Sequence, residues 1–353
     1  MLRPPAHALS GTRRSADLDA VDLRIGPHER RRPAILESVT SSDRITLRFL
    51  AAPQDTAAGG ATVAAGRVLE WIDKAGYACA VGWSASYCVT AYVGNVHFTR
   101  PIASGDMIEA RARIIQTGRT SMQVLVTVGA ADVRSREFTP ATHCILVFVA
   151  VDAAGVPVEV PAWHPETGDD RLLNHRAEER LAPRRAIRDS MLAEAYTDEG
   201  TTARTVFRFL AAPADANYGG NAHGGTVLRW IDETAYACAA GWSSEAAVAV
   251  YSGGIHFFRP IRIGHIVEVD ARLIHTGERS MHIAVHVRSG SPRTPHALEL
   301  TTQCMSIFVD PGADGRAREV APLVLHSDED RRLDAHAIDL IRMRGELEAL
   351  PIG

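Results

Sequence analysis

Hydrophobic and polar residues along the chain follow a pattern that occurs twice. In the second occurrence Val227, Leu228, Ile231, Ala235 and Cys238 recur every three to four residues, which predicts a helix with one buried face. Four β-branched runs follow, AVAVYSGGIHFF, IVEVDARLIHT, MHIAVHVRS and HALELTTQCMSIFVD, and each alternates apolar with polar residues. Gly, Pro and charged turns separate them, as in antiparallel sheets. With an extended segment ahead of the helix, each occurrence predicts a strand, a helix and four strands.

The same blocks of sequence recur in the same order. LRFLAAPQD (47–55) returns as FRFLAAPAD (207–215), and LEWIDKAGYACAVGWS (69–84) returns as LRWIDETAYACAAGWS (228–243). Three further blocks match at nearly the same spacing: VHFTRPIASGD with IHFFRPIRIGH, IIQTGRTSM with LIHTGERSM, and THCILVFV with TQCMSIFV. Agreement in separate blocks with almost constant register indicates a duplication within one chain.

The duplication divides the chain of 353 residues into five expected segments. We expect an N-terminal tail over 1–43, two α+β domains over 44–160 and 204–321, a linker with a charged helix over 161–203, and a charged C-terminal helix over 322–353. The charged composition of the last two segments predicts solvated helices on the outside of the molecule.

Composition restricts the class of protein. The content of 46% hydrophobic and 23% charged residues is that of a soluble globular protein, and a net charge of −4 argues against a general nucleic-acid binder. No signal peptide and no run of about 18 apolar residues is present, which predicts neither export nor membrane insertion. The five cysteines form no CxxC pair and the histidines show no metal-ligand spacing, so we expect a cytoplasmic protein without a metal site.

The segment ADANYGGNAHGGTVLRWID (214–232) is the most informative for chemistry. Its glycines allow the backbone to approach a ligand, and the helix that begins after His223 offers unpaired N–H groups. The amides of Gly224 and Gly225 could therefore stabilise a carbonyl oxygen that becomes negative. Asp232 lies further along this half-buried helix, where a carboxylate needs a partner or a function.

The string DANxxGNxHGG, followed by a helix that carries an acid, resembles the acyl-CoA thioesterase family. The tandem-hotdog hydrolases related to brain acyl-CoA hydrolase are the most similar subgroup, and the resemblance covers both copies over roughly 44–320. It implies two tandem hotdog domains that pair within the chain, each with a long central helix wrapped by a curved antiparallel sheet. It also implies hydrolysis of fatty acyl-CoA to free acid and coenzyme A, without metal or other cofactor, in a homo-oligomer such as a trimer of double hotdogs.

In this family the active site joins an Asn from the loop of one hotdog to an acid on the helix of the other. The resemblance therefore pairs Asn217 with Asp73, which would act as a general base or as a nucleophile. The first copy has Ala57 or Ala58 where the second has Asn217, so the site around Asp232 lacks its amide. We expect one working site in each chain and a degenerate second site.

A further candidate is the T-G-x-x-S-M turn, which also occurs in both copies. Similar turns in the family lie near the pantetheine and phosphates of coenzyme A, and an Arg in the turn could contact a phosphate. The alternative is a hairpin turn that needs Gly and carries a solvated Arg. The candidate residues are Gly118, Arg119, Ser121, Gly277, Arg279 and Ser280.

Two other functions stay open at this point. One is a hotdog enoyl-CoA hydratase or dehydratase that uses a His/Asp pair, although His223 has no counterpart in the first copy and could be a loop histidine bonded to the backbone. The other is a protein that binds acyl-CoA without hydrolysing it, since the first loop has lost its Asn. A hydrolase of the α/β type is excluded, because no G-x-S-x-G motif occurs.

Overall fold

The computed structural model describes residues 42–57, 60, 62–135, 137–312 and 314–346. The chain separates into two compact units, Met1–Thr40 and Ser41–Gly353, and all described residues belong to the second. Almost all of the predicted tail over 1–43 lies outside the described residues.

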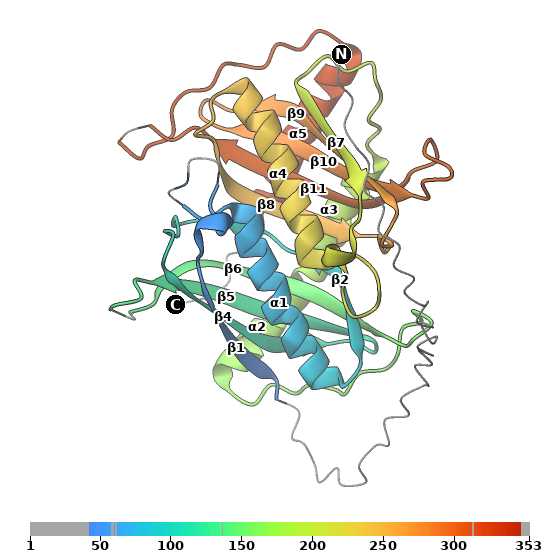
Figure 1. Cartoon of the computed structure of the whole chain (residues 1–353). Helices are drawn as coiled ribbons and strands as arrows, with labels where there is room; N and C mark the ends of the chain where they lie inside the picture. Colours follow the sequence, from blue (N-terminus) through green and yellow to red (C-terminus); the bar gives the residue numbers. More distant parts are fainter. Residues whose placement is uncertain (1–41, 58–59, 61, 136, 313, 347–353) are drawn as a thin grey trace, which may run out of the picture. The chain divides into compact units, whose positions relative to one another are not determined.

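Each copy forms the predicted order of one strand, a long helix and further strands (Figure 1). The first copy comprises β1 (Arg44–Leu50), η1 (Pro53–Asp55), α1 (Ala65–Ser84), β2 (Tyr87–Val93), the short β3 (Val96–His97), β4 (Met107–Thr117), β5 (Ser121–Ala131) and β6 (Thr139–Val151). The second comprises β7 (Arg204–Leu210), η2 (Pro213–Asp215), α4 (Gly224–Trp242), β8 (Val248–Phe257), β9 (Ile266–Thr276), β10 (Met281–Gly290) and β11 (Glu299–Val309).

The strands of both copies join one antiparallel sheet. In the described part of the chain the strand order is β1-β4-β5-β6-β2-β8-β11-β10-β9-β7, and β3 also pairs with β8. The two copies meet at the centre, where Tyr92 and Val93 of β2 pair with His256 and Ile255 of β8. Strands β1 and β7 form the two edges. This pairing between copies brings β2 of the first copy next to the second copy.

Helices α1 and α4 lie side by side on one face of the sheet (Figure 1). Glycines allow their close approach, because a Cβ atom on Gly66 would lie 2.9 Å from Cα of Arg229, and one on Gly225 would lie 2.9 Å from Cα of Glu70. These two glycines occupy the same position in the two copies, at the start of each helix. Each helix therefore places its N-terminal turn against its partner.

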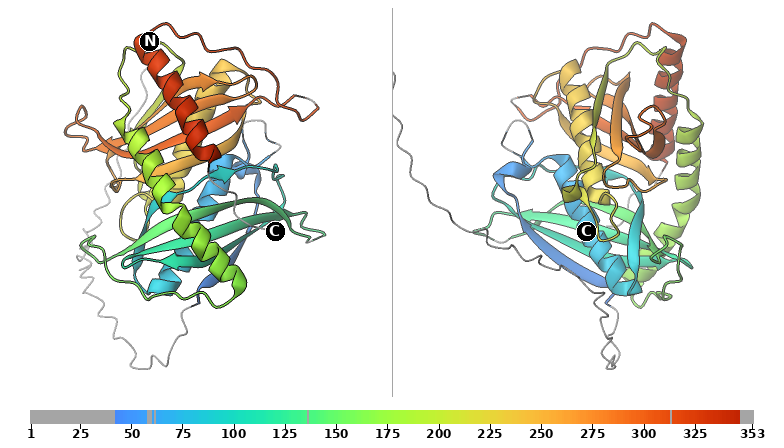
Figure 2. Two further views of the ribbon diagram at one scale, coloured as in Figure 1. Left: turned by 180° about the vertical axis from the view of Figure 1, so that it is seen from behind. Right: turned by 45° about the vertical axis from the view of Figure 1, so that its right-hand side comes forward.

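The helices outside the repeats cover the opposite face of the sheet (Figure 2). They are α2 (Gly168–Glu179), α3 (Leu181–Ala193) and α5 (Asp328–Gly345). Their apolar residues pack on the sheet, with Leu173 against Ile115 and its neighbours and Leu333 and Leu340 around Ile274. The prediction of solvated outer helices is correct for their charged faces and incomplete for these buried ones.

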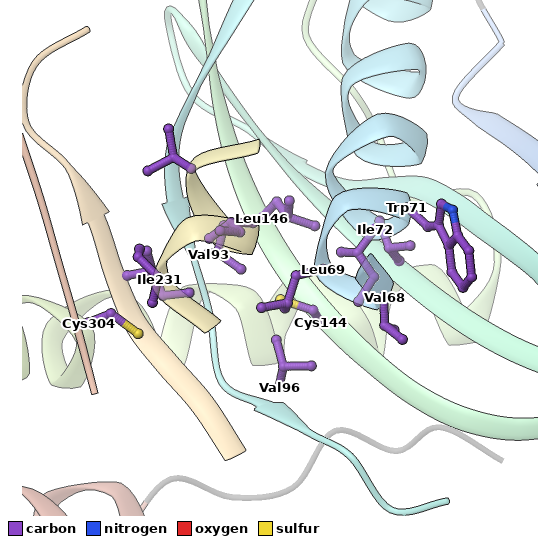
Figure 3. Close-up of a cluster of buried hydrophobic side chains, with 14 of the residues drawn as sticks. Val68, Leu69, Trp71, Ile72, Val93, Val96, Cys144, Leu146, Ile231 and Cys304 are labelled. Carbon is purple, nitrogen blue, oxygen red and sulfur yellow. The ribbon is translucent and has the colours of Figure 1, made fainter. Parts of the chain in front are cut away.

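A continuous hydrophobic core lies between the sheet and the two central helices. Figure 3 shows Leu69 and Ile72 of α1 near Leu146 of β6 and Val93 of β2, with Ile231 of α4 close by. All five cysteines are buried free thiols. Among the described residues no helix is both long and apolar enough to cross a membrane.

Candidate active site

A cavity of about 1150 Å³ lies where the two copies meet. From the first copy, the middle of α1 and the first residues of β2 line the cavity. From the second copy, the loop before α4 and the segment after β8 line it. The cavity brings together four residues that the sequence singled out, namely Asp73, Asn217, His223 and Gly224. Asp73 and Asn217 thus face one space although they come from different copies.

Two hydrogen-bond donors and one imidazole nitrogen surround the carboxylate of Asp73, which is only 1% exposed. The Thr90 hydroxyl donates to Oδ1 over 2.7 Å, and the Gly225 N–H donates to Oδ2 over 2.8 Å. The third neighbour is Nδ1 of His223, 3.0 Å from Oδ2. This shell holds a buried carboxylate in one orientation and leaves it next to the cavity.

His223 is the N-cap of α4 and contacts both the backbone and the carboxylate. Its Nδ1 lies 3.1 Å from the Gly225 nitrogen, from which it can accept a hydrogen bond, and 3.0 Å from Asp73. Burial by itself would lower the pKa of His223, but the hydrogen bond and the negative charge of Asp73 outweigh burial and raise it. The loop histidine thus combines the backbone contact that the sequence favoured with an acid/base partner.

The glycines at the start of α4 have different roles. The sequence had suggested that the N–H of Gly225 binds a substrate carbonyl. This N–H already donates to Asp73, so it is not free for that role. For the N–H of Gly224 no hydrogen bond is found within the described residues. A Cβ atom on Gly224 would lie 3.1 Å from both carboxylate oxygens of Asp73 and 2.9 Å from Oγ1 of Thr90, so only glycine fits there without a shift.

Asn217 is held by its own loop. Its Oδ1 accepts hydrogen bonds from the N–H groups of Gly219 (2.9 Å) and Asn221 (3.2 Å). In the first copy Ala57 makes the matching backbone contact, because Gly60 N–H donates to its carbonyl as Gly220 N–H does to that of Asn217. This assigns Ala57 as the structural counterpart, while Ala58 lies outside the described residues.

The second carboxylate, Asp232, lies in a poorer environment. Its one hydrogen bond among the described residues comes from the Gly66 N–H over 2.7 Å. Burial raises its pKa to about 7. The positions that correspond to His223 and Thr90 are Ala64 and Ala249, so both side-chain partners of the first carboxylate are missing here.

The T-G-x-x-S-M turns do not reach the cavity. Gly118 and Gly277 donate their N–H groups to the carbonyls of Ser121 and Ser280 over 2.8 and 2.9 Å, as hairpin turns do. Arg119 is 76% exposed and 3.6 Å from Glu159, and Arg279 is paired with Glu278 at 3.4 Å. Neither Arg lines the cavity, which favours the hairpin alternative.

The cavity is also lined by residues that the sequence had not singled out, among them Tyr87, Thr90, Arg259 and Arg262. Arg262 has Ala103 at the equivalent position of the first copy, a difference in charge that comparing the repeats could have identified, whereas Arg259 has the counterpart Arg100. Thr90 and Tyr87 have Ala249 and Ala246 at the equivalent positions, and that asymmetry was also visible in the sequence. No cluster of metal-ligating side chains is found in the described part of the chain.

Comparison with known families identifies the fold and its relatives. The family described as "Thioesterase superfamily" matches residues 60–135 of the chain and, a second time, residues 219–296. The acyl-CoA thioester hydrolase YciA of Escherichia coli is 33% identical over 120 residues, which are 33% of this chain and 90% of that protein. The chain belongs to the thioesterase superfamily. The two matched regions confirm the predicted α+β fold of tandem hotdog copies.

Two further proteins are similar to this chain. Acyl-coenzyme A thioesterase 11 of Mus musculus is 22% identical over 237 residues, which are 64% of this chain and 40% of that protein. A solved structure described as an apo-hexameric acyl-CoA thioesterase is 33% identical, with a TM-score of 0.39, and the match covers 41% of this chain and 92% of that one.

Proposed function

We propose that the protein hydrolyses acyl-CoA thioesters to a free acid and coenzyme A, at one composite site in each chain formed by Asp73 and Asn217. The observation that carries this proposal is the asymmetry of the two carboxylates. Asp73 has the partners Thr90 and His223 and shares its cavity with Asn217. Asp232 has a single backbone donor among the residues that the structure describes. The relatives named as acyl-CoA thioester hydrolases supply the reaction class.

The carboxylate of Asp73 would start the reaction in one of two ways. As a general base it would take a proton from water while the water oxygen bonds to the thioester carbonyl carbon. As a nucleophile it would attack that carbon itself and form an anhydride that water then hydrolyses. In both routes the C–S bond breaks and the thiolate of coenzyme A takes up a proton. His223, with Nδ1 at 3.0 Å, can hold the proton beside Asp73.

Two groups are placed to hold the thioester. The Gly224 N–H is the donor at the start of α4 that stays available for a carbonyl oxygen, because Asp73 occupies that of Gly225. Asn217 lines the same cavity, and its Nδ2 makes a long contact, 3.5 Å, with the carbonyl of Ala222. Arg262 also lines the cavity and is exposed, so it can meet a phosphate of coenzyme A.

Release of free thiol from acyl-CoA tests the proposal. Asp73→Asn and Asn217→Ala should each abolish most of the hydrolysis, since a general base contributes on the order of 10²–10⁴-fold. Asp232→Asn is the matched control on the equivalent helix of the second copy, and it should retain most of the activity. If Asp232→Asn is as inactive as Asp73→Asn, the assignment of a single site is wrong.

The contact between His223 and Asp73 favours one second candidate, a hydratase or dehydratase that uses a His/Asp pair. Incubation with a trans-2-enoyl-CoA separates the two reactions. Hydration removes the conjugated double bond without release of thiol, whereas hydrolysis releases thiol. Binding without either change would instead support the acyl-CoA-binding alternative.

The predicted homo-oligomer and the cytoplasmic location stay predictions. The two edge strands expose large apolar side chains, including Leu50 of β1 (61% exposed) and Leu210 of β7 (58% exposed). Exposed apolar residues on open sheet edges are typical of surfaces that pair with another chain. Light scattering on the purified protein measures the number of chains in the particle and tests whether it is a trimer of double hotdogs.

A further inference from the structure

The hydroxyl of Tyr87 is buried in the wall of the cavity, and no acceptor for its proton is found within the described residues. Tyr87 is the first residue of β2, in the first copy. A buried hydroxyl without a partner is unfavourable, so native proteins rarely retain one unless a ligand or water completes it. The position of this group at a site where a substrate would bind calls for an explanation.

Tyr87 packs directly on the loop that carries Asn217. A Cβ atom on Gly219 would lie 2.5 Å from Oη and 2.6 Å from Cζ of Tyr87, so the ring requires glycine at that place. Burial raises the pKa of Tyr87 and the neighbouring Asn217 side chain acts in the opposite direction. With its pKa raised, the phenol stays protonated at neutral pH and is a hydrogen-bond donor.

An aromatic wall connects Tyr87 with the proposed catalytic residues. Tyr77 makes an edge contact with Tyr87 at 6.5 Å between ring centroids and another with His223 at 6.1 Å. Tyr77 also stacks on Tyr218, which is 93% exposed. A ligand that reaches Asp73 through this cavity therefore lies along the wall that holds the Tyr87 hydroxyl.

The second copy has no tyrosine at the position equivalent to Tyr87. Ala246 stands at the position equivalent to Tyr87, two residues before β8, and the loop of the other copy has Ala57 in place of Asn217. The tyrosine thus occurs with the complete loop and is absent opposite the incomplete one. Packing alone does not account for this difference, because a phenylalanine would fill the same space without an unpaired hydroxyl.

We propose that the Tyr87 hydroxyl donates a hydrogen bond to a carbonyl oxygen of the bound acyl-pantetheine segment, either that of the thioester or that of a pantetheine amide. This inference rests on the proposed binding of acyl-CoA in the cavity. It makes Tyr87 a substrate-positioning residue supplied by the first copy, next to the Asn217 loop of the second.

Substitution with phenylalanine tests this role, because Tyr87→Phe removes only the hydroxyl. We expect kcat/KM for butyryl-CoA to fall about tenfold, while the melting temperature stays the same or rises, since the Tyr87 hydroxyl donates no hydrogen bond within the described residues. Tyr236→Phe is the matched control, because the Tyr236 hydroxyl donates to the Glu245 carbonyl over 2.9 Å and lies outside the cavity. That variant should keep its kcat/KM and have an unchanged or lower melting temperature.

Calorimetric titration in the Asp73→Asn background separates the two carbonyl sources and does not depend on turnover. If Tyr87→Phe weakens binding of both coenzyme A and butyryl-CoA, the acceptor is a pantetheine amide. If only butyryl-CoA binds more weakly, the acceptor is the thioester. Affinities for both within about twofold of the parent would overturn the assignment, and so would a melting temperature lowered by Tyr87→Phe as in a structural substitution. Absence of thiol release by the wild-type protein would refute the proposed function and leave the titration decisive for Tyr87.

Discussion

The buried carboxylate of Asp232 gives a quantitative prediction about stability. Its side chain is enclosed between α4 and the start of α1, with one hydrogen bond from the Gly66 N–H. Burial raises its pKa from 3.8 to about 7. Because Asp232 has no place in the proposed reaction, Asp232→Asn should remove the cost of ionising this group and leave hydrolysis intact.

The sign and size of the effect follow from the raised pKa. The folded protein holds the Asp232 proton more tightly than the unfolded chain, so this group favours folding most below about pH 4. That contribution is lost as the pH rises to about 7, because the unfolded chain then ionises freely. The loss amounts to about 4 kcal/mol at most, or about 6 °C in melting temperature for a chain of this size.

A second buried aspartate serves as a control with the opposite sign. Asp330 at the start of α5 accepts hydrogen bonds from Thr201, from its N–H (2.9 Å) and from its hydroxyl (2.6 Å), and further ones from the N–H groups of His326 and Ser327. These donors outweigh burial and hold the pKa of Asp330 far below its usual value. Asp330→Asn should therefore destabilise the protein at neutral pH, where Asp232→Asn stabilises it.

Thermal unfolding of the wild type and both variants between pH 4 and pH 8 measures these effects. The gain from Asp232→Asn should be small near pH 4 and should grow to its full value by about pH 8. A difference that does not change with pH would show that ionisation is not its origin. A stabilised variant that has also lost thiol release would contradict the proposal that Asp73 provides the single active site.

Three further predictions concern the site, the contact between α1 and α4, and two buried histidines of β10. Thr90→Val removes the hydroxyl that donates to Asp73, and we expect thiol release to slow by roughly tenfold, whereas an unchanged rate would remove Thr90 from the site. Gly225→Ala places a Cβ atom 2.9 Å from the backbone of α1. This substitution should lower the melting temperature, because the free energy of unfolding should fall by about 1–3 kcal/mol. Burial lowers the pKa of His282 to about 3 and of His286 to about 4, so their contribution to stability should be complete above about pH 6.5 and fall as the pH drops from there towards 4. Asp232 changes stability in the opposite direction over this range, so the measurement is thermal unfolding of the Asp232→Asn variant, and a flat acid profile of that variant would contradict this.

The sequence determined the features that depend on neighbouring residues. The spacing of apolar residues predicted α1 and α4, and the alternating runs predicted the strands that follow them. Duplicated blocks gave the two copies, and the string around Asn217 gave the loop that enters the cavity. These signals are local, because helical and strand periods and turn residues act over a few positions.

Only the tertiary structure decided which groups from the two copies meet. Pairing of Tyr92 and Val93 with β8 joins the copies into one sheet, and the close approach of α1 and α4 places Gly225 N–H on Asp73. The same packing encloses Asp232 with a single donor. Residues so far apart along the chain meet only when both copies are folded and packed, so no pattern in either copy alone specifies the contact. The sequence by itself therefore supplied two halves with different residues at equivalent positions, and packing placed those differences around the two carboxylates.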